Sequence, residues 1–307
     1  MIQRDECPRV RLRAYAKINL TLEVIRRRPD GYHELRSVFQ AVSLYDELGI
    51  TIRDAAMLLA SAGWGVPRDA SNLCIQAAQL FVAETGWPPG LDMDLYKSIP
   101  VGGGLGGGSS DAAAVLRGLN YLSGDQIPEI ELREMGAQLG SDVAFFLGAG
   151  TALAAGRGEQ LSELYTPRAD WWGVILHPGF EVPTAAAYRA LIPELDFSDG
   201  ARTIRLWHAL NESADLQTIA GCVCNAFRRS LEESHDEVRQ LRAELRRAGA
   251  VVAEVTGSGS CVYGIFANEE QARATSRDLR GAGRWARVVQ PVLLGVEMIE
   301  VREGSET

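Results

Sequence analysis

The most informative segment of the sequence is LDMDLYKSIPVGGGLGGGSSDAAAVL, residues 91–116. Residues 91–96 alternate apolar and polar side chains, which is typical of a half-buried strand. Six glycines then occupy seven positions, and each one permits positive φ and a close approach of the backbone to a ligand. Residues 112–116 are strong helix formers. The pattern predicts a strand, a glycine-rich loop (residues 100–110) and a helix from about residue 110 to residue 122.

The glycine-rich loop has the composition of an anion-binding nest. Its successive N–H groups can point into one concavity. Ser109 and Ser110 stand where a helix N-cap is expected, and the helix start adds free donors and a positive dipole end. We therefore expect bound phosphate along the whole loop, which comprises Pro100, Val101, Gly102, Gly103, Gly104, Leu105, Gly106, Gly107, Gly108, Ser109 and Ser110.

Three other interpretations of the loop are weaker. A flexible Gly/Ser linker is not usually placed between a clean strand and a helix. Gly102, Gly104 and Gly107 satisfy the dinucleotide pattern GxGxxG, but residues 119–130 lack the strand and terminal acid that should follow. The pattern GxxxxGK[ST] is absent, because no lysine follows Lys97. The two serines after the glycines suit Mg²⁺ and phosphate.

The remaining chain mixes strands and helices without a regular βαβ rhythm, which favours an α+β fold. A breaker-rich stretch at residues 156–169 predicts a domain boundary. The patterns predict strands at residues 10–25, 37–52, 173–177, on both sides of 256–260 and at 288–299, and helices at 72–84, 129–139, near 141–142, and at 184–191, 234–248 and 269–279.

Composition excludes several classes of protein. The 307 residues carry a net charge of −9, so bulk electrostatics disfavour nucleic acids and anionic membranes as partners. No apolar run is long enough to span a bilayer, and the first residues do not look like a signal peptide, so we expect a cytoplasmic protein. Five cysteines without a CxxC pair and four histidines without HExxH or HxH spacing predict neither a disulfide framework nor a zinc site.

Three ordered motifs resemble those of the GHMP kinases. Residues 100–111 are similar to the family's phosphate loop, residues 15–20 (YAKINL) to its N-terminal motif and residues 256–261 (TGSGSC) to its C-terminal glycine motif. The resemblance implies an ATP- and Mg²⁺-dependent phosphotransferase that acts on an alcohol. It also implies a two-domain α+β fold. Residues 1–165 would form the N-terminal α/β nucleotide-binding domain, and residues 166–307 would form a ferredoxin-like domain.

Within this family, residues 28–35 (RPDGYHEL) and 139–146 (LGSDVAFF) resemble those of kinases in non-mevalonate isoprenoid synthesis. These kinases phosphorylate the 2-hydroxyl of a cytidine-diphosphate-linked sugar alcohol. The segment DGYH distinguishes these kinases from mevalonate and homoserine kinases, which lack it. The alternatives are another GHMP small-molecule kinase, or a catalytically inactive relative that senses a nucleotide or sugar.

The resemblance implies that Lys17 and Asp142 are the catalytic pair. Asp142 would accept the proton of the substrate hydroxyl. Lys17 would keep that carboxylate ionised and stabilise charge near the transferring group. Taken alone, a lysine and an aspartate would more often be a surface ion pair. Ser110 is the predicted Mg²⁺ ligand.

The same resemblance implies the substrate contacts. Tyr32 would stack on the cytosine and His33 would bind the base edge, although such a pair could also cap a hairpin. Phe39 is a second aromatic wall or a core residue. The remaining predicted contacts are Asn19 near Lys17, and Thr184 and Tyr188 in the second domain. The roles of Asn225, Cys222 and Cys224, the number of metal ions, and the choice between monomer and homodimer stay open.

Overall fold

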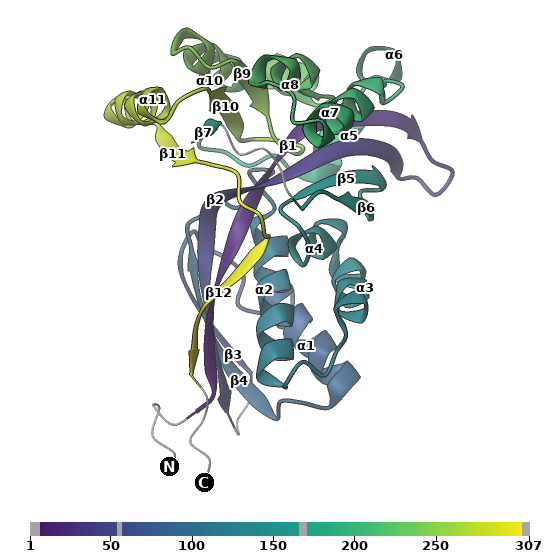
Figure 1. The fold of residues 1–307 in the computed structure, drawn as a ribbon, viewed down its shortest axis with the longest axis vertical. Coiled ribbons are helices and arrows are strands. Elements are labelled where there is room, and N and C mark those ends of the chain that lie inside the picture. The colour runs from purple at the N-terminus through teal and green to yellow at the C-terminus, as the bar shows by residue number, and fades with distance from the viewer. Residues whose placement is uncertain (1–6, 54–56, 166–170, 303–307) are drawn as a thin grey trace.

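The computed structural model describes residues 7–53, 57–165 and 171–302 (Figure 1). The strands are β1 (Arg9–Arg27), β2 (His33–Arg53), β3 (Leu58–Gly63), β4 (Gly90–Lys97), β5 (Thr151–Gly156), β6 (Gln160–Glu163), β7 (Trp172–His177), β8 (Cys224–Asn225), β9 (Val252–Val255), β10 (Val262–Phe266), β11 (Trp285–Val289) and β12 (Val296–Arg302). The helices are α1 (Leu73–Thr85), α2 (Gly107–Leu122), α3 (Glu129–Leu139), α4 (Ser141–Phe146), α5 (Thr184–Arg189), α6 (Pro193–Asp196), α7 (Ala201–Asn211), α8 (Leu216–Cys222), α9 (Arg228–Ser234), α10 (Asp236–Arg247) and α11 (Glu269–Gly281).

The larger sheet carries the N-terminal half of the molecule. Among the described residues it has eight strands, in the order β12-β1-β2-β4-β3, with β5 paired to β2, β6 paired to β5 and β8 paired to β1. β1 and β2 form one long antiparallel hairpin that runs through most of the molecule (Figure 1). Alternate residues such as Leu12 and Leu48 face α1 and α2 and are fully buried. Burial of each such side chain contributes about 1.5–3 kcal/mol.

The smaller sheet confirms the ferredoxin-like prediction. Its described strands pair antiparallel in the order β11-β7-β10-β9, which is 4-1-3-2 in chain order. α10 and α11 pack on this sheet, so the unit has the βαββαβ plan with extra helices after β7. The α+β class is therefore confirmed.

Residues of both sheets share one apolar cluster at the junction of the two units. Ile18 and Leu20 of β1 pack there with Ile175 of β7 and with Tyr263 and Ile265 of β10. Leu105 of the glycine-rich loop is part of the same cluster. The loop is thus fixed at the junction of the two sheets.

The prediction of a single last strand at residues 288–299 is wrong. β11 belongs to the smaller sheet, whereas β12 pairs antiparallel with β1 at the edge of the larger one. Pro291 interrupts the run because it lacks an N–H donor. At Gly295 a side chain would collide with the Phe146 backbone, since a Cβ there would lie 2.4 Å from its Cα. The chain therefore crosses between the sheets here.

The predicted boundary region contains more structure than its breaker residues suggested. β5 ends at Gly156, and β6 forms a hairpin with it inside residues 156–165. The predicted division between residues 165 and 166 falls at the edge of residues 166–170, which lie outside the described residues. The division into residues 1–165 and 166–307 stays a prediction. The strands β3, β5, β6 and β8 and the helices α6–α9 were not predicted.

Candidate active site

One cavity of about 490 Å³ collects most of the predicted site residues. It lies where the glycine-rich loop meets β1, β2, the starts of α1 and α4, the β5–β6 turn, α5 and the turn after β9. The lining residues include Lys17, Asn19, Ser37, Phe39, Val66, Pro67, Asn72, Leu73, Lys97, all of residues 100–109, Asp111, Asp142, Arg157, Gly158, Thr184, Tyr188, Gly257 and Ser258.

The glycines of the loop permit close packing against the turn after β9. A Cβ on Gly104 would lie 2.2 Å from the carbonyl oxygen of Thr256, and a Cβ on Gly103 would lie 2.6 Å from the Cys261 sulfur. The Cys261 N–H also donates to the Gly103 carbonyl over 3.1 Å. Two glycine motifs far apart in the sequence therefore form one contact surface.

The helix after the loop begins earlier than predicted. Gly106, at φ 72°, is the N-cap of α2, and the Ser110 N–H already donates to the Gly106 carbonyl over 2.9 Å. Ser109 and Ser110 therefore lie in the first turn of α2, and neither is its N-cap. The first N–H groups of α2 lack helical partners and lie at the cavity, which is the arrangement that binds phosphate. Ser109 lines the cavity, whereas Ser110 is buried behind it.

Lys17 and Asp142 meet in this cavity. Their Nζ and Oδ2 atoms are 3.4 Å apart, with the lysine side chain 5% exposed and the aspartate 31% exposed. Lys17 also donates to the Asn19 side-chain oxygen over 2.8 Å. The lysine ammonium lies 4.7 Å from the Phe39 ring centroid. The pair is thus half sheltered, with its carboxylate open to a ligand.

Phe39 is a core residue that also lines the cavity, and its contact with the substrate stays a prediction. It is buried against Phe145, with ring centroids 5.3 Å apart, and it still lines the cavity below Lys17.

Asn19 holds Lys17 relative to the C-terminal glycine turn. Its side-chain oxygen accepts the Gly257 N–H over 2.9 Å, and its amide donates to the Ser37 hydroxyl over 2.8 Å. The Tyr263 hydroxyl donates to the backbone carbonyl of Asn19. Its contact with the substrate remains a prediction.

A second buried lysine, which the motif analysis missed, lies under the loop. Lys97 donates to Asp46 and, over 2.7 Å, to Asp111. Asp46 also accepts the N–H groups of residues 98 and 99, whereas one oxygen of Asp111 has no partner among the described residues. Burial and the Asp46 charge raise the pKa of Asp111 to about 8, against the opposing effect of Lys97. A sequence signal existed, because Lys17 and Lys97 are the only lysines among the 307 residues.

The predicted cytidine residues lie toward the hairpin between β1 and β2. The His33 ring stacks on the Tyr188 ring with centroids 4.9 Å apart, and Tyr188 lines the cavity. Burial, with the nearby Asp142 charge, raises the pKa of Tyr188 to about 12. Burial also lowers the pKa of His33, with a smaller contribution from Arg27, which favours the neutral imidazole. Tyr32 is 58% exposed and lies outside the cavity lining.

Thr184 lines the cavity near the glycine turn. Its hydroxyl is 3.2 Å from that of Ser258.

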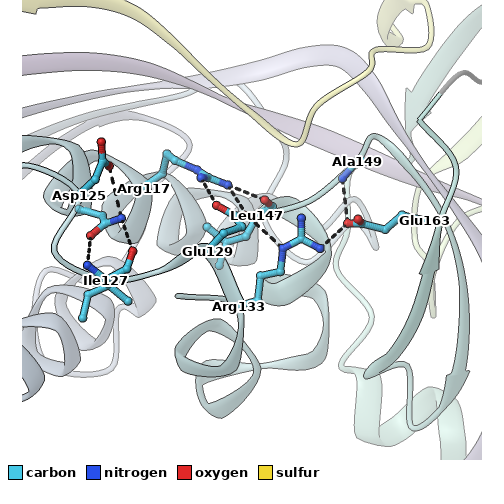
Figure 2. A network of polar contacts seen from close by, with 9 residues as sticks. Arg117, Asp125, Ile127, Glu129, Arg133, Leu147, Ala149 and Glu163 are labelled. Carbon is cyan, nitrogen blue, oxygen red and sulfur yellow. Dashed lines mark hydrogen bonds and ion pairs between the residues drawn. The ribbon is translucent and has the colours of Figure 1, made fainter. Parts of the chain in front are cut away.

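A polar network fixes the short helix that carries Asp142 (Figure 2). Arg117 of α2 donates to the carbonyl at the end of α4, that of Leu147, and to Glu129 of α3. Arg133 bridges Glu129 to Glu163 of β6. This network ties α2, α3, α4 and β6 together, so Asp142 sits on a rigid support.

Two kinds of feature are absent from the described residues. No helix in residues 7–53, 57–165 or 171–302 is long and apolar enough to cross a membrane. The same residues contain no cluster of three or more His, Cys, Asp or Glu side chains arranged to hold a metal ion.

Comparison with known proteins agrees with the geometry. The family model for the GHMP kinases N terminal domain matches residues 72–150, and that for GHMP kinases C terminal matches residues 206–284. A 4-diphosphocytidyl-2-C-methyl-D-erythritol kinase of Geobacter metallireducens is 38% identical over 279 residues, or 89% of this chain and 95% of the relative. The kinase of that name from Bacillus subtilis is 37% identical over 89% of this chain and 93% of its own length.

Solved structures give the same result. A crystal structure of 4-(cytidine 5'-diphospho)-2C-methyl-D-erythritol kinase has a TM-score of 0.78 at 35% identity and covers 92% of this chain and 98% of its own. A homoserine kinase from Cytophaga hutchinsonii, at 18% identity and a TM-score of 0.73 over 97% of this chain and 99% of its own, shares the fold. The loop, the paired glycine turn and these relatives together show that the chain belongs to the GHMP kinases.

Proposed function

We propose that this protein transfers the γ-phosphoryl group of ATP to the 2-hydroxyl of 4-diphosphocytidyl-2-C-methyl-D-erythritol, in non-mevalonate isoprenoid precursor synthesis. The observation that carries the proposal is that Lys17 and Asp142 face each other in the cavity lined by the glycine-rich loop. The named relatives at 37–38% identity support the choice of substrate.

ATP would occupy the side of the cavity formed by the loop. Its phosphates would lie against the backbone amides of residues 102–109. Val66, Pro67 and Leu73 line the same cavity and offer an apolar surface for a flat base. In this position the γ-phosphoryl group would face the proposed catalytic pair.

Asp142 and Lys17 have separate tasks in the transfer. The Asp142 carboxylate would accept the proton of the attacking hydroxyl, a role worth about 10²–10⁴-fold in rate. The Lys17 ammonium, held by Asn19 and the Phe39 ring, would stabilise negative charge on the transferring group. Product formation would leave ADP on the loop.

Mg²⁺ suits the oxygen donors at the loop. The hydroxyl of Ser110 is buried without a partner among the described residues, and the Ser109 hydroxyl and the Asp142 carboxylate are further oxygen ligands of the kind that Mg²⁺ prefers. When bound with ATP, Mg²⁺ neutralises phosphate charge. The absence of an acidic cluster among the described residues fits an ion held mainly by phosphates.

The cytidine would bind between the β1–β2 hairpin and α5. Tyr32 and Tyr188 offer aromatic faces, and neutral His33 offers one donor and one acceptor to the base edge. A cytoplasmic location, and a state of monomer or homodimer, accompany this proposal as predictions.

The test is a phosphoryl-transfer assay. Purified protein is mixed with ATP, Mg²⁺ and the cytidine substrate, and ADP release is followed. We expect turnover by the wild type and a loss of at least about 10²-fold in kcat for Asp142→Asn, with ATP affinity retained. Asp94→Asn, which changes an exposed carboxylate on β4, is the matched control and should behave as the wild type.

Three other outcomes would contradict the proposal. Wild-type rates in Asp142→Asn would remove this residue from catalysis. Turnover of homoserine or mevalonate alone would make the protein a different GHMP kinase. ATP binding without turnover of any of these alcohols would make it an inactive sensor.

A further inference from the structure

The turn between β5 and β6 presents one arginine to the cavity. Arg157 is exposed at the turn and lines the cavity beside Gly158. The turn itself is held locally, because the Arg157 N–H donates to the Glu159 carboxylate over 2.6 Å. The backbone that carries this guanidinium is therefore fixed, while the side chain can turn toward a ligand.

Arg157 differs from the two other cations that line the described cavity. Lys17 contacts Asp142 and Asn19, and Lys97 is bound by two buried carboxylates. No carboxylate of a described residue lies within ion-pair distance of the Arg157 guanidinium, although its charge reaches Asp30 on the hairpin. The Arg157 guanidinium carries five N–H donors, and no carboxylate of a described residue pairs with them. These donors are therefore available to an anionic ligand in the cavity.

The position of Arg157 is intermediate between two ends of the site. Its guanidinium carbon lies 5.1 Å from the centroid of the Tyr32 ring, at the predicted cytosine end. A Cβ on the adjacent Gly158 would lie 3.6 Å from the Cβ of Ser141, the residue before Asp142. The turn thus connects the predicted cytosine end to the reaction centre.

We propose that Arg157 binds the diphosphate of the cytidine-diphosphate-linked substrate. In that substrate the diphosphate joins the nucleoside to the sugar alcohol, so it must lie between the base site and Asp142. A planar guanidinium matches two phosphate oxygens at once and can keep its face on the Tyr32 ring. The inference rests on the proposed function, and it makes Arg157 a specificity residue for a diphosphate in a chain of net charge −9.

The test uses cytidine, CMP and CDP as competitive inhibitors of the full-length enzyme in the kinase assay. In Arg157→Gln we expect the inhibition constant of CDP to rise about 10-fold or more, because charge-assisted hydrogen bonds are lost. The constants of cytidine and the KM for ATP should stay the same. Arg157→Lys should recover part of the CDP affinity, and the CDP effect should shrink at high salt. Arg26→Gln, which removes an exposed arginine from the β1–β2 hairpin that carries Tyr32, is the matched control.

The possible results separate this inference from the proposed function. If the wild type does not phosphorylate the cytidine substrate, the proposed function fails. If it does, and Arg157→Gln weakens cytidine and CDP equally, Arg157 acts only by supporting Tyr32 and the diphosphate role is wrong. Unchanged CDP affinity, or a raised KM for ATP in place of the CDP effect, would also overturn it. Arg157→Lys gives the same comparison if Arg157→Gln does not fold.

Discussion

At the scale of single residues, the site depends on buried charges that share partners. The single charge of Lys97 is shared by two carboxylates, so the group of three carries one surplus negative charge if all are ionised. Asp46 accepts two further N–H donors, whereas Asp111 has only Lys97. Asp111 is therefore the member that keeps a proton, which agrees with a pKa raised to about 8, first by burial and then by Asp46.

This proton predicts a pH-dependent stability. Between about pH 4 and pH 8 the unfolded chain has lost the Asp111 proton and the folded protein keeps it, so folding becomes less favourable as pH rises. Asp111→Asn removes the titration. We expect the stability of the wild type relative to this variant to fall over that range, measured by denaturant unfolding without nucleotide or metal. A difference that stays constant with pH would contradict the assignment.

At the scale of elements, the loop and the turn after β9 are built as one surface. Gly104 has φ 78°, and a side chain there would meet the Thr256 carbonyl. Gly124 has nearly the same φ, 77°, but has nothing within 4 Å of a Cβ. A side chain at either glycine would strain the backbone, but only a side chain at Gly104 would also collide with a neighbour. Comparing the two positions therefore isolates the effect of the close contact.

Alanine at these two positions should have different effects. Gly124→Ala should cost only the left-handed strain, about 1–2 kcal/mol, and leave ATP affinity unchanged. Gly104→Ala should cost more and weaken ATP binding, because the loop must move away from the turn. Free energies of unfolding and ATP titrations of both variants make the comparison. Equal losses would show that the contact is not needed.

In the whole molecule, strands from the second half of the chain complete the larger sheet. β12 and β8, from the second half of the chain, pair with β1 of the first half. Val296 of β12 belongs to the core that α1 and α2 cover. The N-terminal unit therefore lacks one edge of its sheet until the end of the chain is added (Figure 1).

A fragment of residues 1–165 should not fold alone. Its β1 would expose unpaired backbone groups along residues 9–14 and an open side of its core. We expect no cooperative unfolding transition by circular dichroism for this fragment. Addition of residues 166–307 as a second chain should restore the transition. A cooperative transition in the isolated fragment would show that β12 is dispensable.

The sequence predicts those parts of the site that lie within one continuous motif. The strand, the loop and α2 follow one another, and Lys17 and Asp142 lie in recognisable segments. Contacts between distant segments leave no local pattern: Asp46, Lys97 and Asp111 are brought together only by the pairing of β2 with β4 and the packing of α2. For the same reason, the local pattern of residues 288–299 did not reveal that this segment contributes strands to two different sheets. The first turn of α2 was misplaced because it contains Gly107 and Gly108, which are poor helix formers, and Gly106 before them is the N-cap.

The rarity of lysine has a consequence for how the protein can be regulated. The ε-amines of Lys17 and Lys97 are buried in or under the cavity, and the surface cations are arginines. Acetylation, ubiquitination and other acylations of lysine therefore find no accessible side-chain amine on the folded chain. A reagent or enzyme that acylates lysine would have to reach the cavity itself. The extent of lysine acylation would therefore depend on whether a ligand occupies the cavity.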